Sequence, residues 1–175
     1  AVATGIKRVH PSQVVFTYQG DGDISAIGCG EIVHAALRGE KITTIFVNNA
    51  IYGMTGGQMA PTTLAGQKTV PSPEGRQSSS VGMPMGLSEM LSTLAGAKYI
   101  SRVAVDSPKN MAAAKSAIKE AFQVQLRQEG FSMVEVLSTC PTNWGKTPLE
   151  AVKWLRENMI PQFPLGIYKN VGGEK

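Results

Sequence analysis

Cysteine is scarce in this chain, which has two cysteines among its 175 residues. Cys29 and Cys140 lie far apart, and a single pair does not give the disulfide framework of a small secreted domain. Long apolar runs are missing as well, so we expect neither a membrane span nor a secretory leader. These absences favour a protein of the reducing cytoplasm with no membrane partner.

Basic runs and aromatic ladders are also missing, although the formal net charge is +4. The 17 lysines and arginines are scattered along the chain, and aromatic residues make up 6% of it. Nucleic-acid binding requires clustered positive charge, so the composition predicts no nucleic-acid partner. With 42% hydrophobic and 17% charged residues, the chain can bury a sizeable core, and we expect one domain over residues 1–175.

Two short runs rich in apolar, β-branched and aromatic residues, 13–18 and 42–47, predict buried strands. Between them, the apolar positions of residues 25–38 fall on one face of a helix. A strand, a helix and a strand of these lengths form a right-handed unit with parallel strands. The alternation continues through predicted helices 85–97, 108–128 and 148–158 and predicted strands 99–105 and 131–137. We therefore expect an α/β fold with a doubly wound, mostly parallel sheet and helices on both faces.

Each strand of the first unit ends in residues suited to binding a ligand. Residues 20–23 (Gly-Asp-Gly-Asp) follow the first strand, and residues 48–49 (Asn-Asn) follow the second. The carboxyl ends of parallel strands meet at one edge of the sheet, so we expect Asp21 and Asn49 to lie close together. The glycines let the backbone approach a ligand closely. The amides that follow Asp21 open the predicted helix, and the start of a helix binds anions.

Two carboxylates, Asp21 and Asp23, stand where a phosphate would lie, and they would repel it unless a cation intervened. A hard divalent cation takes oxygen ligands from carboxylates, amides, backbone carbonyls and diphosphate together. The Asp21 carboxylate, the Asn49 side-chain oxygen and the Ile51 carbonyl could supply the protein's share. The sequence therefore predicts a magnesium–diphosphate site at this edge of the sheet.

A dinucleotide-binding unit is the structural alternative, and it fits these residues poorly. Its fingerprint requires a third glycine at the position of Ser25. It also requires an acidic residue where the chain has Asn48 and Asn49. An acidic turn that caps a helix would explain residues 20–23 but not the two asparagines. The magnesium–diphosphate interpretation accounts for both halves.

The spacing of these motifs resembles the cofactor fingerprint of thiamine diphosphate enzymes: Gly-Asp-Gly at 20–22, then 25 residues, then Asn-Asn at 48–49. The longer strings, residues 20–28 and 48–58, are similar to the β subunit of 2-oxoacid:ferredoxin oxidoreductases of the 2-ketoisovalerate, 2-oxoglutarate or pyruvate type. The resemblance extends from about Ala3 to Lys169. It implies the thiamine diphosphate-binding fold, with this chain as the diphosphate-binding module.

The resemblance also implies roles for single residues. In the family, the three ligands named above hold Mg²⁺, and the residues beside them bind thiamine diphosphate. The implied cofactor-binding residues are Gly20, Asp21, Gly22, Asp23, Asn49, Ile51, Tyr52, Gly53, Met54 and Thr55. Gly22, Asp23 and Thr55 would bind the diphosphate. Gly56 would join Tyr52 in lining the substrate pocket, together with Met54.

The implied activity is oxidative decarboxylation of a 2-oxoacid with coenzyme A as acyl acceptor, and a branched-chain 2-oxoacid or 2-oxoglutarate is favoured. Electrons would leave through iron–sulfur clusters to ferredoxin or a ferredoxin-like subunit. In the family, the glutamate that activates the pyrimidine of the cofactor lies on a different domain. The resemblance therefore implies no catalytic residue in this chain and an α subunit as the partner that carries the pyrimidine-binding domain.

Two other functions stay open. The chain could be a module of another thiamine diphosphate enzyme, of the decarboxylase or acetohydroxyacid synthase type. The string Met54–Gln58 and Cys140 speak against this alternative. It could also be a non-catalytic magnesium–phosphate binding module, for which the missing glutamate is the main argument.

Cys140 follows the end of predicted strand 131–137. A lone cysteine is usually a small buried hydrophobic residue. The resemblance implies instead a ligand of a [4Fe–4S] cluster whose other cysteines lie in a segment before Ala1, so we expect this chain to be a fragment of the subunit. We also expect Ala3–Lys7 to be the end of a helix whose start is missing from this sequence.

Residues 54–86 are rich in proline, glycine, serine and threonine. A stretch of this length without secondary structure is usually functional or disordered. For residues 54–58 we expect a functional loop that folds over the cofactor. Beyond residue 58 a functional loop and a mobile surface excursion are equally open, and whether residues 67–80 are ordered stays open with them.

Overall fold

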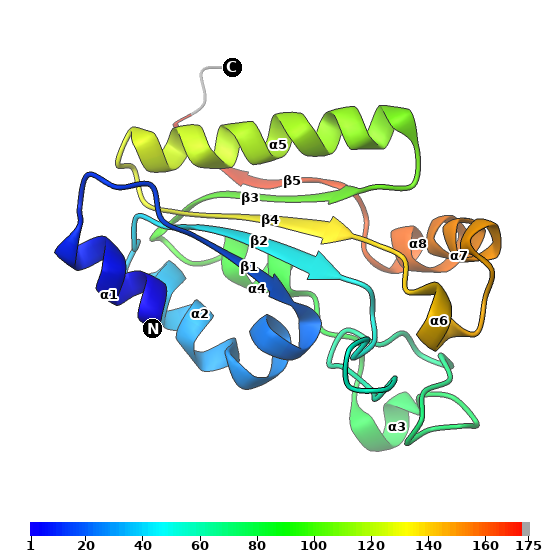
Figure 1. The fold of residues 1–175 in the computed structure, drawn as a ribbon. Coiled ribbons are helices and arrows are strands. Elements are labelled where there is room, and N and C mark those ends of the chain that lie inside the picture. The colour runs from blue at the N-terminus through cyan, green and yellow to red at the C-terminus, as the bar shows by residue number, and fades with distance from the viewer. Residues whose placement is uncertain (173–175) are drawn as a thin grey trace.

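The computed structural model describes residues 1–172 of the chain. They form a five-stranded sheet in the order β1-β2-β4-β3-β5. The strands are β1 (Phe16–Gly20), β2 (Thr43–Asn48), β3 (Ala97–Ala104), β4 (Phe131–Leu137) and β5 (Gly166–Asn170). The first four pair in parallel, and β5 joins β3 in antiparallel orientation at the edge. The predicted α/β fold with a mostly parallel sheet is confirmed (Figure 1).

Helices cover both faces of this sheet, as predicted (Figure 1). The long helix α5 (Pro108–Leu126) lies over one face. The other face carries α1 (Val2–Val9), α2 (Cys29–Leu37) and α4 (Leu87–Ser92). Among the described residues, no helix combines the length and the apolar character needed to cross a membrane.

Two hydrophobic clusters fill the space between the sheet and these layers. Side chains alternate between the faces of a strand, so neighbours such as Ile45 and Phe46 enter different clusters. Phe46 packs in the cluster under α2 and α4, together with Met133 of β4. Ile45 packs under α5 with Val134, against a row of small residues that includes Ala117. The small row lets the helix lie close to the sheet.

Short helices gather beyond the carboxyl ends of the strands (Figure 1). They are α3 (Ser78–Val81), α6 (Pro141–Trp144), α7 (Pro148–Trp154), the π-helix η2 (Leu155–Met159) and α8 (Ile160–Gln162). The start of α7 is fixed by a capping box between Thr147 and Glu150. Leu137, at the end of β4, packs with Leu155 and Phe163 in a third hydrophobic cluster. This end of the sheet is therefore enclosed by packed structure.

The first predicted strand, 13–18, is displaced toward the motif and spans 16–20 in the structure. The cause lies at Val15, whose amide donates to Gln125 Oε1 at 2.7 Å. In return, Gln125 Nε2 donates to the Val15 carbonyl at 2.7 Å. A side chain of α5 thus takes the Val15 amide, while the Val15 carbonyl also accepts from the Thr43 amide of β2 at 3.3 Å.

The predicted helix 25–38 is wrong at its start, because the chain turns helical directly after Asp21. Residues Gly22–Ile27 form the π-helix η1, and α2 follows after Gly28. The Gly28 amide donates to the Asp23 carbonyl at 2.6 Å, five residues back. A Cβ at Gly28 would stand 2.5 Å from that carbonyl oxygen, so this tight turn requires glycine. Single π-helical turns are frequent at functional sites.

Other predicted boundaries differ by a few residues. Predicted helix 85–97 shortens to α4, since the chain turns at Gly96, where a Cβ would lie 2.3 Å from the Ala36 carbonyl. Predicted strand 131–137 and the start of the helix at 108 are confirmed. The predicted helix 148–158 continues through η2 and α8 to Gln162.

Four elements were not predicted in full. The helix expected at Ala3–Lys7 is α1, which the structure describes from Val2 to Val9. The short helix α3 lies inside the predicted loop, and α6 lies where no helix was predicted. Strand β5 was missed altogether. Its burial pattern shows no buried residue, so it lacks the alternation that identifies a strand from the sequence.

Candidate functional site

The ends of β1 and β2 lie side by side at one edge of the sheet. The two strands pair in parallel, with Gly20 opposite Val47. Asp21 and Asn49 therefore leave the sheet next to each other, as the sequence predicted. Asp21 is only 4% exposed and caps the start of η1.

Hydrogen bonds hold the Asp21 carboxylate in one orientation. Its Oδ1 accepts from the Gly22 amide at 3.0 Å, and its Oδ2 accepts from the Ile51 amide at 3.0 Å. The hydroxyl of Thr62, which is fully buried, lies 3.5 Å from the same Oδ2. No lysine or arginine within residues 1–172 forms an ion pair with Asp21. The carboxylate is thus fixed in place without a cationic partner from the described chain.

Burial raises the pKa of the Asp21 carboxyl to about 6, although the Ile51 and Gly22 amides that donate to it act to lower the pKa. The charged form is therefore costly in the folded chain at neutral pH. A bound cation would offset this cost, because it favours the charged carboxylate.

The raised pKa predicts how stability depends on pH. An acid whose folded pKa lies above its ordinary 3.8 stabilises the fold below about pH 4 and loses that contribution as the pH rises through about 6. The contribution of Asp21 corresponds to at most about 3 kcal/mol. We expect the free energy of unfolding of the metal-free chain to fall between pH 5 and pH 7.5, and to fall less in Asp21→Asn. Urea unfolding at both pH values tests this, and an equal fall in the free energy of unfolding in the two proteins would contradict it.

One of the two polar atoms of the Asn49 side-chain amide lies close to both the Ile51 carbonyl oxygen and Asp21 Oδ2. That atom lies 2.6 Å from the Ile51 carbonyl oxygen and 3.1 Å from Asp21 Oδ2. If the atom is nitrogen, it donates a hydrogen bond to each oxygen. If it is oxygen, three oxygens converge without a proton between them, which is stable only around a cation. Adjacent ligands of an octahedral Mg²⁺ ion lie about 3 Å apart, so the residues present fit the predicted metal site.

The turn that carries Asn49 and Ile51 is strained and held from two sides. Ala50 between them has a φ of 58°, in the left-handed region that non-glycine residues rarely adopt. The Ala50 carbonyl accepts from Thr63 Oγ1 at 2.7 Å and from Gln67 Nε2 at 3.0 Å. The loop after the motif therefore clamps the turn that presents two of the three oxygens.

That loop is ordered around Arg76, whose side chain is buried and whose guanidinium donates only to backbone carbonyls. The six acceptors, at 2.7–3.3 Å, are the carbonyls of Ala60, Pro61, Thr63, Val81, Gly82 and Met83. Residues 67–80, which the sequence left open, therefore form an ordered loop. Arg76 was missed, although it is the one arginine in a stretch of proline, glycine and serine.

Residues 52–58 form a small closed loop, as the Tyr52 amide donates to the Gln58 carbonyl at 3.0 Å. The Tyr52 ring lies against Gly22, where a Cβ would stand 3.3 Å from the ring. Burial, and secondarily the Asp21 charge, raises the pKa of Tyr52. Met54 is fully exposed at the tip of the loop. Of the predicted pocket residues, Tyr52 thus lies next to the motif, whereas the Met54 side chain is open to solvent.

Two predicted diphosphate ligands are engaged with neighbours in this structure. The Asp23 carboxylate is exposed and accepts from the Gly20 amide at 2.9 Å. The Thr55 hydroxyl donates to Gln58 Oε1 at 2.6 Å. Their roles toward a diphosphate stay predictions.

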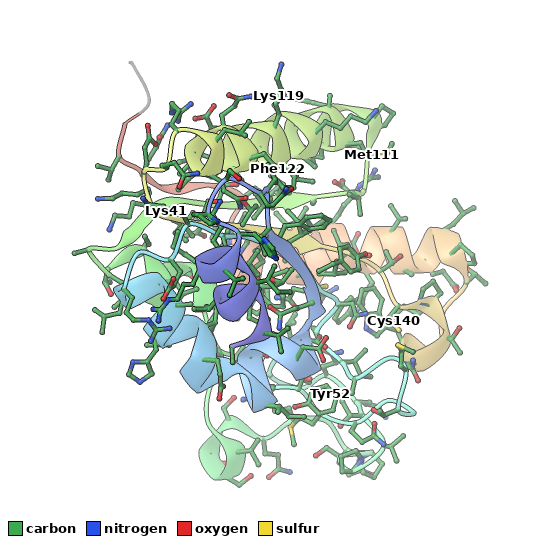
Figure 2. All side chains as sticks on the ribbon, turned by 60° about the vertical axis from the view of Figure 1, so that its left-hand side comes forward. Lys41, Tyr52, Met111, Lys119, Phe122 and Cys140 are labelled. Carbon is green, nitrogen blue, oxygen red and sulfur yellow. The ribbon has the colours of Figure 1, made fainter. Side chains whose placement is uncertain are left out.

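Cys140 lies at the same end of the molecule as Tyr52 (Figure 2). Its Sγ accepts from Asn143 Nδ2 at 3.3 Å, and that amide also donates to the Gly53 carbonyl at 2.9 Å. Cys140 is partly exposed rather than buried. Within the described part of the chain, no group of three or more histidine, cysteine, aspartate or glutamate residues could hold a metal ion. Any cluster at Cys140 would need ligands from outside these residues, so its role stays a prediction.

Comparison with known proteins places this site in context. Residues 1–136 match the family described as thiamine pyrophosphate enzyme, C-terminal TPP binding domain. Thiamine pyrophosphate is another name for thiamine diphosphate. Ketoisovalerate oxidoreductase subunit VorA of Methanothermobacter thermautotrophicus is 45% identical over 174 residues, which are 99% of this chain and 36% of that protein. 2-Oxoglutarate synthase subunit KorB of Archaeoglobus fulgidus is 42% identical over 158 residues, 90% of this chain and 55% of that protein.

A solved structure of 2-oxoglutarate:ferredoxin oxidoreductase from Magnetococcus marinus, with 2-oxoglutarate, coenzyme A and succinyl-CoA bound, superimposes with a TM-score of 0.77. It is 26% identical, and the match covers 99% of this chain and 62% of that chain. This chain therefore spans only part of each relative, between 36% and 55% of the length of the two curated proteins.

Proposed function

We propose that this chain, which belongs to the family of C-terminal TPP binding domains of thiamine pyrophosphate enzymes, is the β-subunit module of a 2-oxoacid:ferredoxin oxidoreductase. The two curated relatives described above are subunits of ketoisovalerate oxidoreductase and of 2-oxoglutarate synthase. Because the chain covers only part of them, the activity, substrates and partners of the whole enzyme are part of this proposal.

One observation carries the proposal: the same polar atom of the Asn49 side chain lies 2.6 Å from the Ile51 carbonyl oxygen and 3.1 Å from Asp21 Oδ2. In our proposal the Asn49 tip is oxygen, and the three groups hold Mg²⁺. The ion held there would also take diphosphate oxygens as ligands. In the first turn of η1, the Gly22 amide donates to Asp21 Oδ1, and the amides that follow it have no partner earlier in the helix. They would bind diphosphate oxygens beside the metal.

Thiamine diphosphate supplies an electron sink for the decarboxylation of a 2-oxoacid. The residues of this chain bind and orient it. Asp21 compensates the charge of the metal, and the Tyr52 ring covers Gly22 at the diphosphate end. The loop tip with Met54 and Gly56 would face the substrate. The glutamate that activates the pyrimidine would come from an α subunit, so the site is completed at a subunit interface.

The partly exposed thiol of Cys140, on the same side of the molecule as this loop, would be one ligand of a [4Fe–4S] cluster in the full subunit. Electrons from the decarboxylation would pass through it to ferredoxin or a ferredoxin-like subunit, and coenzyme A would accept the acyl group. Binding of coenzyme A and succinyl-CoA in the structural relative supports this acceptor. The Cys140 sulfur lies near Gly53, so the proposed cluster would lie next to the cofactor loop.

A branched-chain 2-oxoacid is our first choice of substrate, since the ketoisovalerate relative matches 99% of this chain at 45% identity. The 2-oxoglutarate relative matches 90% at 42% identity. We expect the assembled enzyme to reduce methyl viologen with 2-ketoisovalerate faster than with 2-oxoglutarate or pyruvate, and the isolated chain to show no turnover. A panel assay with coenzyme A tests both statements. Turnover by the chain alone, or cofactor binding without oxidation of any 2-oxoacid by the assembly, would contradict the proposal.

A further inference from the structure

We propose that Asn48 and Glu135 are positioning residues for the metal site: a buried carboxylate locks the orientation of the Asn48 amide, and Asn48 sets the turn that aims the metal ligands. The inference rests on the proposed function, because it concerns the same Mg²⁺ ion. Neither residue touches that site directly. Both are at most 1% exposed, Asn48 at the end of β2 and Glu135 within β4.

Asn48 joins the sheet to the turn through both ends of its amide. Its Nδ2 donates to Glu135 Oε1 at 2.8 Å. Its Oδ1 accepts from the Ala50 amide at 3.0 Å, the local contact of an asparagine with the residue two places on. That contact favours the left-handed conformation of Ala50, which is otherwise costly for a residue with a Cβ. If the Asn48 amide reversed, its NH₂ would face the Ala50 N–H and the turn would lose this support.

The backbone conformation of Ala50 affects the position of all three proposed metal ligands. The next residue, Ile51, donates its amide to Asp21 Oδ2 at 3.0 Å. Its carbonyl lies 2.6 Å from the Asn49 tip. A change at Ala50 would therefore turn the Ile51 carbonyl and release the Asp21 carboxylate. Magnesium demands near-ideal octahedral geometry, so it is sensitive to such a shift.

Glu135 can act as a lock because both of its carboxylate oxygens accept. Oε1 accepts from Asn48, and Oε2 accepts from Ser88 Oγ at 2.5 Å and from Arg102 Nε at 2.8 Å. A glutamine of the same shape has only one oxygen, so its NH₂ would face either the Asn48 NH₂ or the Arg102 N–H. Only a carboxylate satisfies both sides while the Asn48 amide keeps its orientation.

Glu135 is itself held by a rigid neighbour. Arg102 stands opposite Glu135 in the register of β3 and β4. Its side chain is fully buried, makes two bonds to Glu89 at 2.7 and 2.8 Å, and lies between the rings of Phe163 and Tyr168. Buried ion pairs are often no more stabilising than apolar side chains of the same volume. A positional role accounts for retaining this cluster under the metal site.

An exchange of the two polar groups tests the inference. Asn48→Asp alone sets a carboxylate oxygen against Glu135 Oε1. Glu135→Gln alone sets the new NH₂ group against either the Asn48 NH₂ group or the Arg102 N–H. The double variant, Asn48→Asp with Glu135→Gln, restores every donor–acceptor pair with the same total charge. We expect each single change to weaken thiamine diphosphate binding in Mg²⁺ by about 10- to 100-fold, as outer-shell changes do at metal sites. We expect the double variant to return to within about 3-fold of the wild type.

The readout is the ratio of thiamine diphosphate affinities in Mg²⁺ and in Ca²⁺, measured by calorimetry on the cofactor-free assembly that contains this chain. Calcium accepts flexible geometry, so a loosened turn should lower the Mg²⁺/Ca²⁺ ratio by about 10-fold, whereas a purely structural role would lower the melting temperature and leave the ratio unchanged. Ser88→Ala is the matched control, because it removes one donor to Glu135 and leaves the contact with Asn48 intact. Its ratio should equal that of the wild type.

The outcomes separate the two proposals. A wild-type assembly without Mg²⁺-dependent binding of thiamine diphosphate would overturn the proposed function and this inference with it. A wild type that binds, with single variants that keep its ratio or a double variant that does not recover it, would overturn this inference alone. If either single variant does not fold, Asn48→Ala, which removes the lock without a mismatch, should show the same lowered ratio, and an unchanged ratio would overturn the inference.

Discussion

Replacing Asp21 with asparagine is expected to weaken Mg²⁺-dependent binding of thiamine diphosphate by at least about 100-fold, because loss of a charged ligand exceeds the 10- to 100-fold cost of an outer-shell change. Asparagine keeps the size of the side chain but removes the charge that draws the cation to a site where burial already raises the pKa of Asp21 to about 6. Because asparagine has only one acceptor oxygen, it also sets its NH₂ group against either the Gly22 amide or the Ile51 amide, both of which donate to Asp21 at 3.0 Å.

Asp23→Asn is the matched control for this prediction, because Asp23 would bind the diphosphate through its backbone amide, which the substitution keeps. The change in charge is the same and lies two residues away, but Asp23 is exposed and its carboxylate accepts from the Gly20 amide, a bond that an asparagine oxygen retains. Calorimetric titration of both variants with thiamine diphosphate, with and without Mg²⁺, should show a much smaller loss for Asp23→Asn. Equal losses would mean that the total charge of the motif matters and the position of Asp21 does not.

Replacing Arg76 with methionine is expected to reduce the free energy of unfolding by about 3 kcal/mol or more. Methionine fills most of the same apolar volume but donates no hydrogen bond. The six carbonyls would each lose one donor. Those of Ala60 and Pro61 keep a backbone amide donor, and each buried carbonyl left unsatisfied costs about 1–3 kcal/mol. The same loop presents Thr63 and Gln67 to the Ala50 carbonyl, so cofactor affinity should fall as well.

Urea unfolding and limited proteolysis measure the effect of Arg76→Met, and new cleavage sites are expected between residues 60 and 83. Arg156→Met is the control, because Arg156 is half exposed and pairs with Asp106 near the surface. Such a pair contributes about 0–1 kcal/mol. A loss at Arg76 no larger than at Arg156, or cleavage that stays outside the loop, would contradict the account of the loop.

The meeting of Asp21 with Asn49 and Ile51 could be predicted because it depends on topology. Two consecutive strands that pair in parallel must end at the same edge of the sheet, and the residues after those ends are read directly from the sequence. The prediction therefore survives the shift of β1 from 13–18 to Phe16–Gly20, which moves the strand but keeps its end beside the motif.

The residues that support the site could not be predicted in the same way. Arg102 and Glu135 stand opposite each other on β3 and β4, and this depends on the register of two strands far apart in the sequence. In the sequence, Arg102 and Glu135 each stand as a charged residue within an apolar run, with nothing to indicate that they pair. Arg76 donates to carbonyls both before and after it in the chain, and no local sequence pattern indicates such contacts. The exposed strand β5 lacks alternation for a similar reason, since it pairs only at the edge of the sheet.

The π-helix after Asp21 shows a limit of a different kind. Apolar spacing correctly indicated a helix between β1 and β2, but it could not indicate the extra residue in the first turn. That extra residue depends on Gly28, where any side chain would strike the Asp23 carbonyl. The effect is to start the helix directly at Asp21, so the capping carboxylate and the first amides stand together at the proposed diphosphate site.

Anomalous diffraction from crystals grown with thiamine diphosphate and Mn²⁺ in place of Mg²⁺ tests the central claim most directly. The account predicts one strong metal peak at about 2.0–2.3 Å from Asp21 Oδ2, from the side-chain oxygen of Asn49 and from the Ile51 carbonyl oxygen. A bound cofactor whose metal lies away from these three oxygens, or an Asn49 amide that donates its NH₂ to Asp21 while the cofactor is bound, would contradict it.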